Sequence, residues 1–151
     1  MNDNREIQLL YVDLTDSSVR PVTVPQEVVR DYIGGTGLAA KILWEATRAE
    51  TTAFSEENLL IFMIGPLTGT PSPSGNRYVA ASISPLTGIW GEAYGGGAFP
   101  YLLSRTPYRG IVIRGKAKTP VVLWIDGSGA RIADAGHLWG MDTFEVDAIL
   151  K

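Results

Sequence analysis

The residues best suited to chemistry lie between Gly65 and Phe99, in a stretch rich in glycine, proline, serine and threonine. Arg77 follows Ser-Gly-Asn and precedes an apolar run, and three glycines follow at 95–97. A guanidinium beside such a loop can hold a phosphate or a carbonyl-rich ring through two hydrogen bonds. Glycines let the backbone approach a ligand closely, and a helix starting after them would present free N–H groups. The stretch therefore predicts a backbone-lined site for a polar, phosphate-bearing ligand.

Each of these features also has a purely structural explanation. A flexible or tight turn would account for the glycines, and a surface ion pair would account for Arg77. The two Pro-Leu-Thr-Gly copies, at 66–69 and 85–88, are interpreted as turns anchored by a buried leucine. The glycines match neither the dinucleotide-binding nor the P-loop pattern, so a nucleotide is a poor candidate. His137, the only histidine, is expected to have a structural role because no partner ligand is near it in the sequence.

Composition excludes several kinds of site. The 151 residues include no cysteine, so the chain itself cannot supply disulfides, thiolate-bound metals or a cysteine-bound iron–sulfur cluster. The net charge is −3 and there is no basic run, so we expect no nucleic-acid partner. No apolar stretch approaches the ~20 residues of a membrane helix, and the polar N-terminus lacks the apolar segment of a signal peptide. We therefore expect a cytoplasmic protein without a membrane partner.

Strands and helices must together position the site. Strands are predicted at 7–14, 19–24, 59–64, 78–83, 110–114, 121–126 and 130–133, and helices at 25–33, 38–48, 98–105 and 142–151. The first two strands form one hairpin and the last two another, and each hairpin leads into an amphipathic helix. We therefore predict an α+β domain of internally duplicated hairpin-plus-helix units around twisted β-sheets, with the second repeat incomplete.

This duplication divides the chain into a first repeat of about 1–117 and the start of a second at about 118–151. Because the second copy ends within a helix, we expect the chain to be part of something longer. Most of the four tryptophans and six tyrosines are expected to lie in the core.

Several short motifs, taken in order, resemble the N-terminal domain of the aldehyde ferredoxin oxidoreductase family, the tungsten or molybdenum bis-pterin enzymes. They are GGTGL at 34–38, SEENLLIF at 55–62, GPLTGT at 65–70, GNRY at 75–78, SPLTG at 84–88, GG at 95–96, GKA at 115–117 and HLWG at 137–140. Each motif is weak alone, but the ordered set is highly specific and spans nearly the whole chain.

The resemblance implies a cofactor of two dithiolene pterins on one tungsten or molybdenum ion, with this domain as the base on which it lies. It implies that Arg77 contacts a pterin and that Gly95 and Gly96, with the flanking Tyr94 and Gly97, cradle pterin and phosphate. Tyr94 replaces the family's asparagine, which offers a carbonyl oxygen to magnesium. A phenol is a poor neutral ligand for Mg²⁺, so Tyr94 is a departure from the family pattern at the magnesium that bridges the pterin phosphates. The iron–sulfur cysteines of the family lie in later domains, consistent with their absence here.

Two functions are compatible with these residues. The first is the cofactor-binding domain of an enzyme that oxidises aldehydes to carboxylic acids and passes electrons to ferredoxin. Its partners would be the downstream domains of the same enzyme, ferredoxin, and a second copy in a homo-oligomer. No catalytic acid or base and no metal ligand is assigned, so we expect the chain alone to be inactive. The alternative is a divergent, non-catalytic homologue acting as a ligand-binding or subunit-assembly module. Two departures from the family pattern suggest this alternative: Tyr94 in place of asparagine, and Arg109 in place of the family's aspartate.

Overall fold

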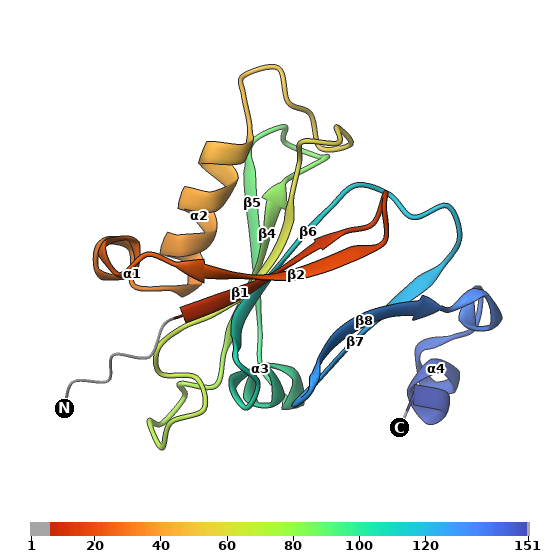
Figure 1. The fold of residues 1–151 in the computed structure, drawn as a ribbon. Coiled ribbons are helices and arrows are strands. Elements are labelled where there is room, and N and C mark those ends of the chain that lie inside the picture. The colour runs from red at the N-terminus through yellow and green to blue at the C-terminus, as the bar shows by residue number, and fades with distance from the viewer. Residues whose placement is uncertain (1–6, 151) are drawn as a thin grey trace.

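The computed structural model describes residues 7–150, which form an α+β domain with a six-stranded mixed sheet, a separate hairpin and four helices (Figure 1). The strands are β1 (Ile7–Asp13), β2 (Ser18–Val24), β3 (Leu60–Ile64), β4 (Tyr78–Ile83), β5 (Trp90–Gly95), β6 (Tyr108–Arg114), β7 (Val121–Asp126) and β8 (Gly129–Asp134). The helices are α1 (Gln26–Tyr32), α2 (Gly35–Ala46), α3 (Ala98–Ser104) and α4 (Thr143–Leu150), with a short 3₁₀ helix, η1, at Gly136–Leu138. Among these residues, no helix has the length and apolarity needed to cross a membrane.

The large sheet has the strand order β2-β1-β6-β3-β4-β5, and β7 and β8 form the two-stranded sheet. β1 pairs antiparallel with β2 and parallel with β6, whereas β3 pairs antiparallel with both β6 and β4. Both predicted hairpins and all four predicted helices are confirmed, within a few residues at their ends. β2 and β5 are the two edge strands, and Pro21 lies in β2, where its missing N–H is best tolerated.

β5 was not predicted from the sequence, where the segment before the glycines was interpreted as part of a loop. Its residues, Trp-Gly-Glu-Ala-Tyr-Gly, include two glycines and no β-branched side chain, so intrinsic strand preference is weak. The strand forms because it pairs antiparallel with β4 along its whole length, from Tyr78 opposite Gly95 to Ile83 opposite Trp90. The glycine-rich stretch is therefore a β-ribbon with a loop at each end rather than one long loop.

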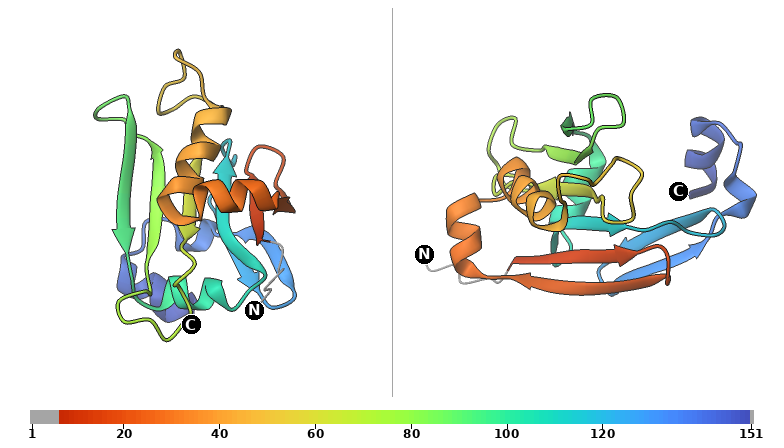
Figure 2. Two further views of the ribbon diagram at one scale, coloured as in Figure 1. Left: turned by 90° about the vertical axis from the view of Figure 1, so that its left-hand side faces the viewer. Right: turned by 90° about the horizontal axis from the view of Figure 1, so that it is seen from above.

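Two hydrophobic layers cover the large sheet, and Figure 2 shows its backbone from two further sides. On one face, Leu38, Ala39 and Leu43 of α2 pack on inward-facing residues of β1, β3, β4 and β6. On the other face, Leu103 of α3 and the apolar side chains of the β7–β8 hairpin pack on the alternate residues of β1, β3 and β6. Burial of this apolar area, at ~25 cal/mol per Å², is the main stabilising contribution to the domain.

The prediction that most tryptophans and tyrosines are core residues is wrong. Trp44 is 83% exposed, Trp139 is 79% exposed and Tyr94 is 61% exposed, whereas among the tyrosines only Tyr108 is fully buried. Leucine, isoleucine, valine and methionine fill the core instead. Composition counts apolar residues but does not say which face of an element carries them, and Trp44 lies on the outer face of α2.

Candidate functional site

Arg77 and the triple glycine meet at one end of the β4–β5 ribbon. Tyr78, the first residue of β4, pairs with Gly95, the last residue of β5, so the residues just outside the ladder lie side by side. A Cβ atom placed on Gly96 would lie 3.7 Å from a guanidinium nitrogen of Arg77 and 3.4 Å from the carbonyl oxygen of Asn76. The structure therefore brings together Arg77 and the glycines at 95–97, which are at least 18 positions apart in the sequence.

Gly95 and Gly97 are held in place by the segment that carries Arg77. A Cβ atom on Gly95 would lie 2.5 Å from the ring of Tyr78, so only glycine fits there without movement of that ring. The side-chain amide of Asn76 donates a 2.8 Å hydrogen bond to the carbonyl oxygen of Gly97, whose φ is +81°. These contacts clamp the glycine segment against the start of β4.

The guanidinium of Arg77 is exposed, and within residues 7–150 it makes no hydrogen bond or ion pair. The described part of the chain thus offers no partner for the surface ion pair that was the structural explanation of this arginine. Five N–H donors in a fixed fork remain available for an anion or a ring with carbonyl groups.

The buried Thr68 fixes the backbone of Arg77 through a hydrogen bond. Its side chain is only 4% exposed, and its hydroxyl lies 2.8 Å from the carbonyl oxygen of Arg77 and 3.2 Å from that of Gly75. A single hydroxyl donates one proton, so these two carbonyls share it. Thr68 was not among the candidate site residues predicted from the sequence. Its position in a Pro-Leu-Thr-Gly motif was a signal, but Thr87 of the second copy is exposed, so the motif alone does not identify it.

Both Pro-Leu-Thr-Gly copies form turns, as predicted, but the expected buried leucine anchor is wrong. Leu67 is 56% exposed and Leu86 is 92% exposed. In the first copy the Thr68 N–H donates to the Gly65 carbonyl, which puts Leu67 at the tip of the turn, where the side chain points to solvent. In the second copy the turn is one residue longer, because the Gly88 N–H donates to the Ser84 carbonyl, and Leu86 lies at its middle.

Tyr94 is fixed by two hydrogen bonds on the helix-covered face of the sheet. Its hydroxyl lies 2.7 Å from Thr36 Oγ1 in the first turn of α2, and it donates to Glu92 Oε1 at 3.1 Å. With its proton given to Glu92, the phenol accepts from Thr36. Thr36 lies 58 residues from Tyr94 and was not singled out by the sequence as a site residue.

Acidic and metal-binding groups are sparse around this site. Among the described residues, no three histidine, cysteine, aspartate or glutamate side chains are grouped to hold a metal ion. Glu92, whose carboxylate accepts the hydrogen bond from Tyr94, is exposed. His137 lies in η1, outside this cluster of contacts. The arrangement of Arg77, the glycines and Tyr94 can bind and orient a polar group.

Comparison with known proteins gives a consistent result. Residues 9–151 match the family model described as aldehyde ferredoxin oxidoreductase, N-terminal domain. The chain is 38% identical over 144 residues to the tungsten-containing aldehyde ferredoxin oxidoreductase of Pyrococcus abyssi, a match covering 95% of this chain and 24% of that protein. It is 36% identical to the aliphatic sulfonate oxidoreductase WOR-like subunit of Pyrococcus furiosus, with 92% of this chain and 22% of the relative covered.

A solved structure also matches closely. A chain of the active-site complex BamBC of benzoyl coenzyme A reductase, in complex with 1,5-dienoyl-CoA, superposes with a TM-score of 0.92 at 38% identity. The match covers 95% of this chain and 22% of that one. The chain thus spans about a quarter of the length of the relatives that it matches. Both sequence and fold confirm the resemblance seen in the ordered motifs, and the chain belongs to the aldehyde ferredoxin oxidoreductase family, of which it represents the N-terminal domain.

Proposed function

We propose that this chain is the cofactor-binding N-terminal domain of a tungsten- or molybdenum-pterin enzyme of the aldehyde:ferredoxin oxidoreductase type. Such an enzyme oxidises an aldehyde to a carboxylic acid and passes the electrons to ferredoxin. The observation that carries the proposal is the exposed guanidinium of Arg77 beside Gly96, which has no partner within the described residues 7–150, in a domain that is similar to tungsten-containing enzymes.

The described residues fit a pterin with a phosphate at two points. The N–H donors of Arg77 match the carbonyl and ring-nitrogen acceptors of a pterin, or the oxygens of a phosphate. Gly96 keeps the surface over that guanidinium free of side-chain atoms, because a Cβ there would lie 3.7 Å from it. Gly95 and Gly97 would shape the same wall through their backbone. When bound, the metal–pterin group would supply the redox chemistry, whereas these residues would bind and orient it.

Tyr94 would have a different role from the asparagine that it replaces in the family. Its hydroxyl is already engaged by Thr36 and Glu92, and a phenol is a weak ligand for a hard cation. We therefore assign Tyr94 to the wall of the cofactor site and assign no magnesium ion to it. An iron–sulfur cluster in such an enzyme would need cysteines from outside these residues, since the chain has none.

The fold supports a finer proposal about repeats. The β1–β2 hairpin leads into α1, and the β7–β8 hairpin leads through η1 into α4. We infer that these are two copies of one unit, the first spanning about 1–117 and the second beginning at about 118. The remaining domains of the enzyme, ferredoxin and a second copy in a homo-oligomer would be its partners.

That the substrate is an aldehyde is our proposal, because family membership does not determine the substrate. The relatives are named for aldehydes, aliphatic sulfonates and benzoyl coenzyme A, so membership alone does not select an aldehyde. The alternative function is a non-catalytic homologue that binds a ligand or assembles subunits. Tyr94, held by Thr36 where the family has asparagine, favours this alternative, and cofactor analysis separates the two.

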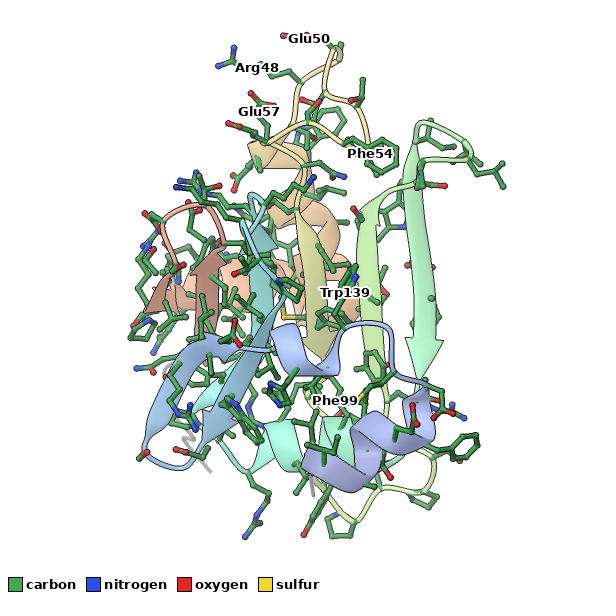
Figure 3. All side chains as sticks on the ribbon, turned by 90° about the vertical axis from the view of Figure 1, so that its right-hand side faces the viewer. Arg48, Glu50, Phe54, Glu57, Phe99 and Trp139 are labelled. Atoms are coloured by element: carbon green, nitrogen blue, oxygen red, sulfur yellow. The ribbon has the colours of Figure 1, made fainter. Side chains whose placement is uncertain are left out.

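The test uses the full-length protein produced with tungstate, with its metal and pterin contents measured by elemental analysis and by fluorescence of the oxidised pterin. Arg77→Gln should lower both contents about tenfold or more, because charge-assisted hydrogen bonds contribute ~1.5–3 kcal/mol. Arg48→Gln is the matched control, since Arg48 is an exposed arginine after α2, at the end of the molecule away from α3 (Figure 3). A metal-free, pterin-free wild-type protein supports the alternative function, and full cofactor content in Arg77→Gln removes Arg77 from the site.

A further inference from the structure

A cleft of about 900 Å³ lies where β3 ends and β6 begins. Its walls come from the start of β1, the end of β2, α1, the turn before α2 and the connection between α3 and β6. Neither Arg77 nor the glycines at 95–97 line it. Its volume is within the range of small-molecule binding sites, ~300–1,000 Å³.

The charge of this cleft is opposite to that of the chain. The whole sequence carries 16 acidic and 13 basic residues, yet the only charged residues that line the cleft in the described structure are Arg105 and Arg109. Among the described residues no carboxylate lines the cleft beside these two guanidiniums, and their charge produces a local positive potential, which a low-dielectric wall strengthens. The cleft therefore favours an anion.

A β-bulge places Arg109 at this cleft. The β1–β6 register shifts between Gln8 and Leu9, because Gln8 pairs with Tyr108 whereas Leu9 pairs with Gly110. Arg109 is the extra residue, and it has no partner in β1. The bulge breaks the alternation of side chains, so Tyr108 stays buried on the hairpin face while Arg109 lines the cleft. Bulges of this kind commonly re-aim a side chain beside a binding site.

Most hydrogen-bond donors of these arginines are free within residues 7–150. Arg109 donates one long bond, 3.4 Å, to the carbonyl oxygen of Ser104, and no bond is formed by the side chain of Arg105. The hydroxyls of Ser104 and Thr106 are engaged by backbone carbonyls of α3. Arg109 is part-buried, so a salt bridge formed there would be screened less than one at the open surface.

The opposite wall of the cleft is apolar. Val29 and Ile33 lie at its α1 side, and Leu38 and Met63 are buried beneath it. We propose that the cleft binds a small organic anion, with its carboxylate or phosphate held by Arg109 and Arg105 and its apolar body against Val29 and Ile33. This site uses none of the residues assigned to the pterin, so it goes beyond the proposed function and does not depend on it.

Isothermal titration of the full chain with inorganic phosphate, acetate and hexanoate tests the site. We expect millimolar binding of phosphate or of a carboxylate, and hexanoate should bind more tightly than acetate if the head is a carboxylate. Phosphate without carboxylate binding identifies a phosphate ester, and the reverse identifies a carboxylic acid. Arg109→Gln should weaken binding at least tenfold, whereas Arg48→Gln should leave it unchanged.

Two further measurements keep the outcome clear. Thermal unfolding of each variant shows whether it folds, and Arg109→Lys, which keeps the charge but loses the fork, should bind with intermediate affinity. Arg109→Gln should also retain the metal and pterin contents of the full-length protein, so the two proposals fail separately. Absence of binding by all three probes, or equal binding by folded Arg109→Gln and wild type, would overturn the inference.

Discussion

The hydroxyl groups of Thr36 and Tyr94 lie 2.7 Å apart and join the first turn of α2 to the edge strand β5. β5 has only one neighbouring strand, β4, so this contact is a second attachment for it. It fixes the strand two residues before the point where the chain turns past Arg77. The position of the glycine segment therefore depends on a helix that precedes it by about fifty residues.

Removing this contact should loosen β5 measurably. Tyr94→Phe deletes the hydroxyl that bonds Thr36 and Glu92, so the free energy of unfolding should fall by ~0.5–1.5 kcal/mol, measured by urea denaturation. Thr36→Val should have a similar effect, and the double variant should cost less than the sum, since both remove one interaction. Tyr101→Phe, at a comparably exposed tyrosine, is the control. Strict additivity would show that the pair contributes no shared stability.

Thr68 and Thr87 occupy the same place in the two Pro-Leu-Thr-Gly motifs, which allows a matched comparison. Thr68→Val keeps the shape but leaves the carbonyls of Gly75 and Arg77 without their partner, at a cost of ~1–3 kcal/mol. Thr87→Val changes an exposed side chain, so unfolding should move by less than ~0.5 kcal/mol. Equal effects in chemical denaturation would contradict the assignment of Thr68 as the residue that holds Arg77.

Adjacent glycines should separate folding from ligand binding. Gly95→Ala places a methyl group 2.5 Å from the Tyr78 ring, so stability should fall by ~1–3 kcal/mol. Gly96→Ala meets nothing closer than 3.4 Å, so its melting temperature should stay near that of the wild type. The same methyl group would cover the Arg77 guanidinium, and pterin content of the full-length protein should therefore decrease. A stable Gly96→Ala protein with normal pterin content would place the pterin elsewhere.

The decrease of the melting temperature at low pH should depend on Asp13. A hydrogen bond from the Arg114 guanidinium, together with one from the Thr15 backbone, lowers the pKa of Asp13 below its usual 3.8. A carboxyl with a depressed pKa in the folded state stabilises the protein above the unfolded pKa, and this contribution is lost as pH falls through the folded value. Asp13→Asn should flatten the pH dependence of the melting temperature below about pH 4. Arg114→Gln should flatten it partly, and an unchanged slope in both variants would contradict this account.

The local sequence pattern predicted most of the strands and helices, because hairpins and helices depend on residues close in sequence. It also predicted one site for Arg77 and Gly96, which lie side by side at one end of the β4–β5 ladder. The local pattern did not predict β5, because its two glycines and lack of β-branched residues give it a weak strand preference. It also did not predict Thr36 as a site residue, because its partner Tyr94 is 58 positions away. The bulge at Arg109 was equally out of reach, because it is set by the register with β1, about a hundred residues earlier.

That bulge makes the chemistry of the cleft sensitive to chain length as well as to residue type. Deleting one residue from the pair Tyr108–Arg109 would restore the regular ladder with β1 and remove the position of β6 that has no β1 partner in the described structure. An insertion or deletion of a single codon at this point could thus create or abolish the anion site in one step, while the sheet around it kept its register. Among homologues of equal fold, the number of residues at the start of β6 opposite Gln8 and Leu9 is then a guide to this site in addition to the arginines themselves.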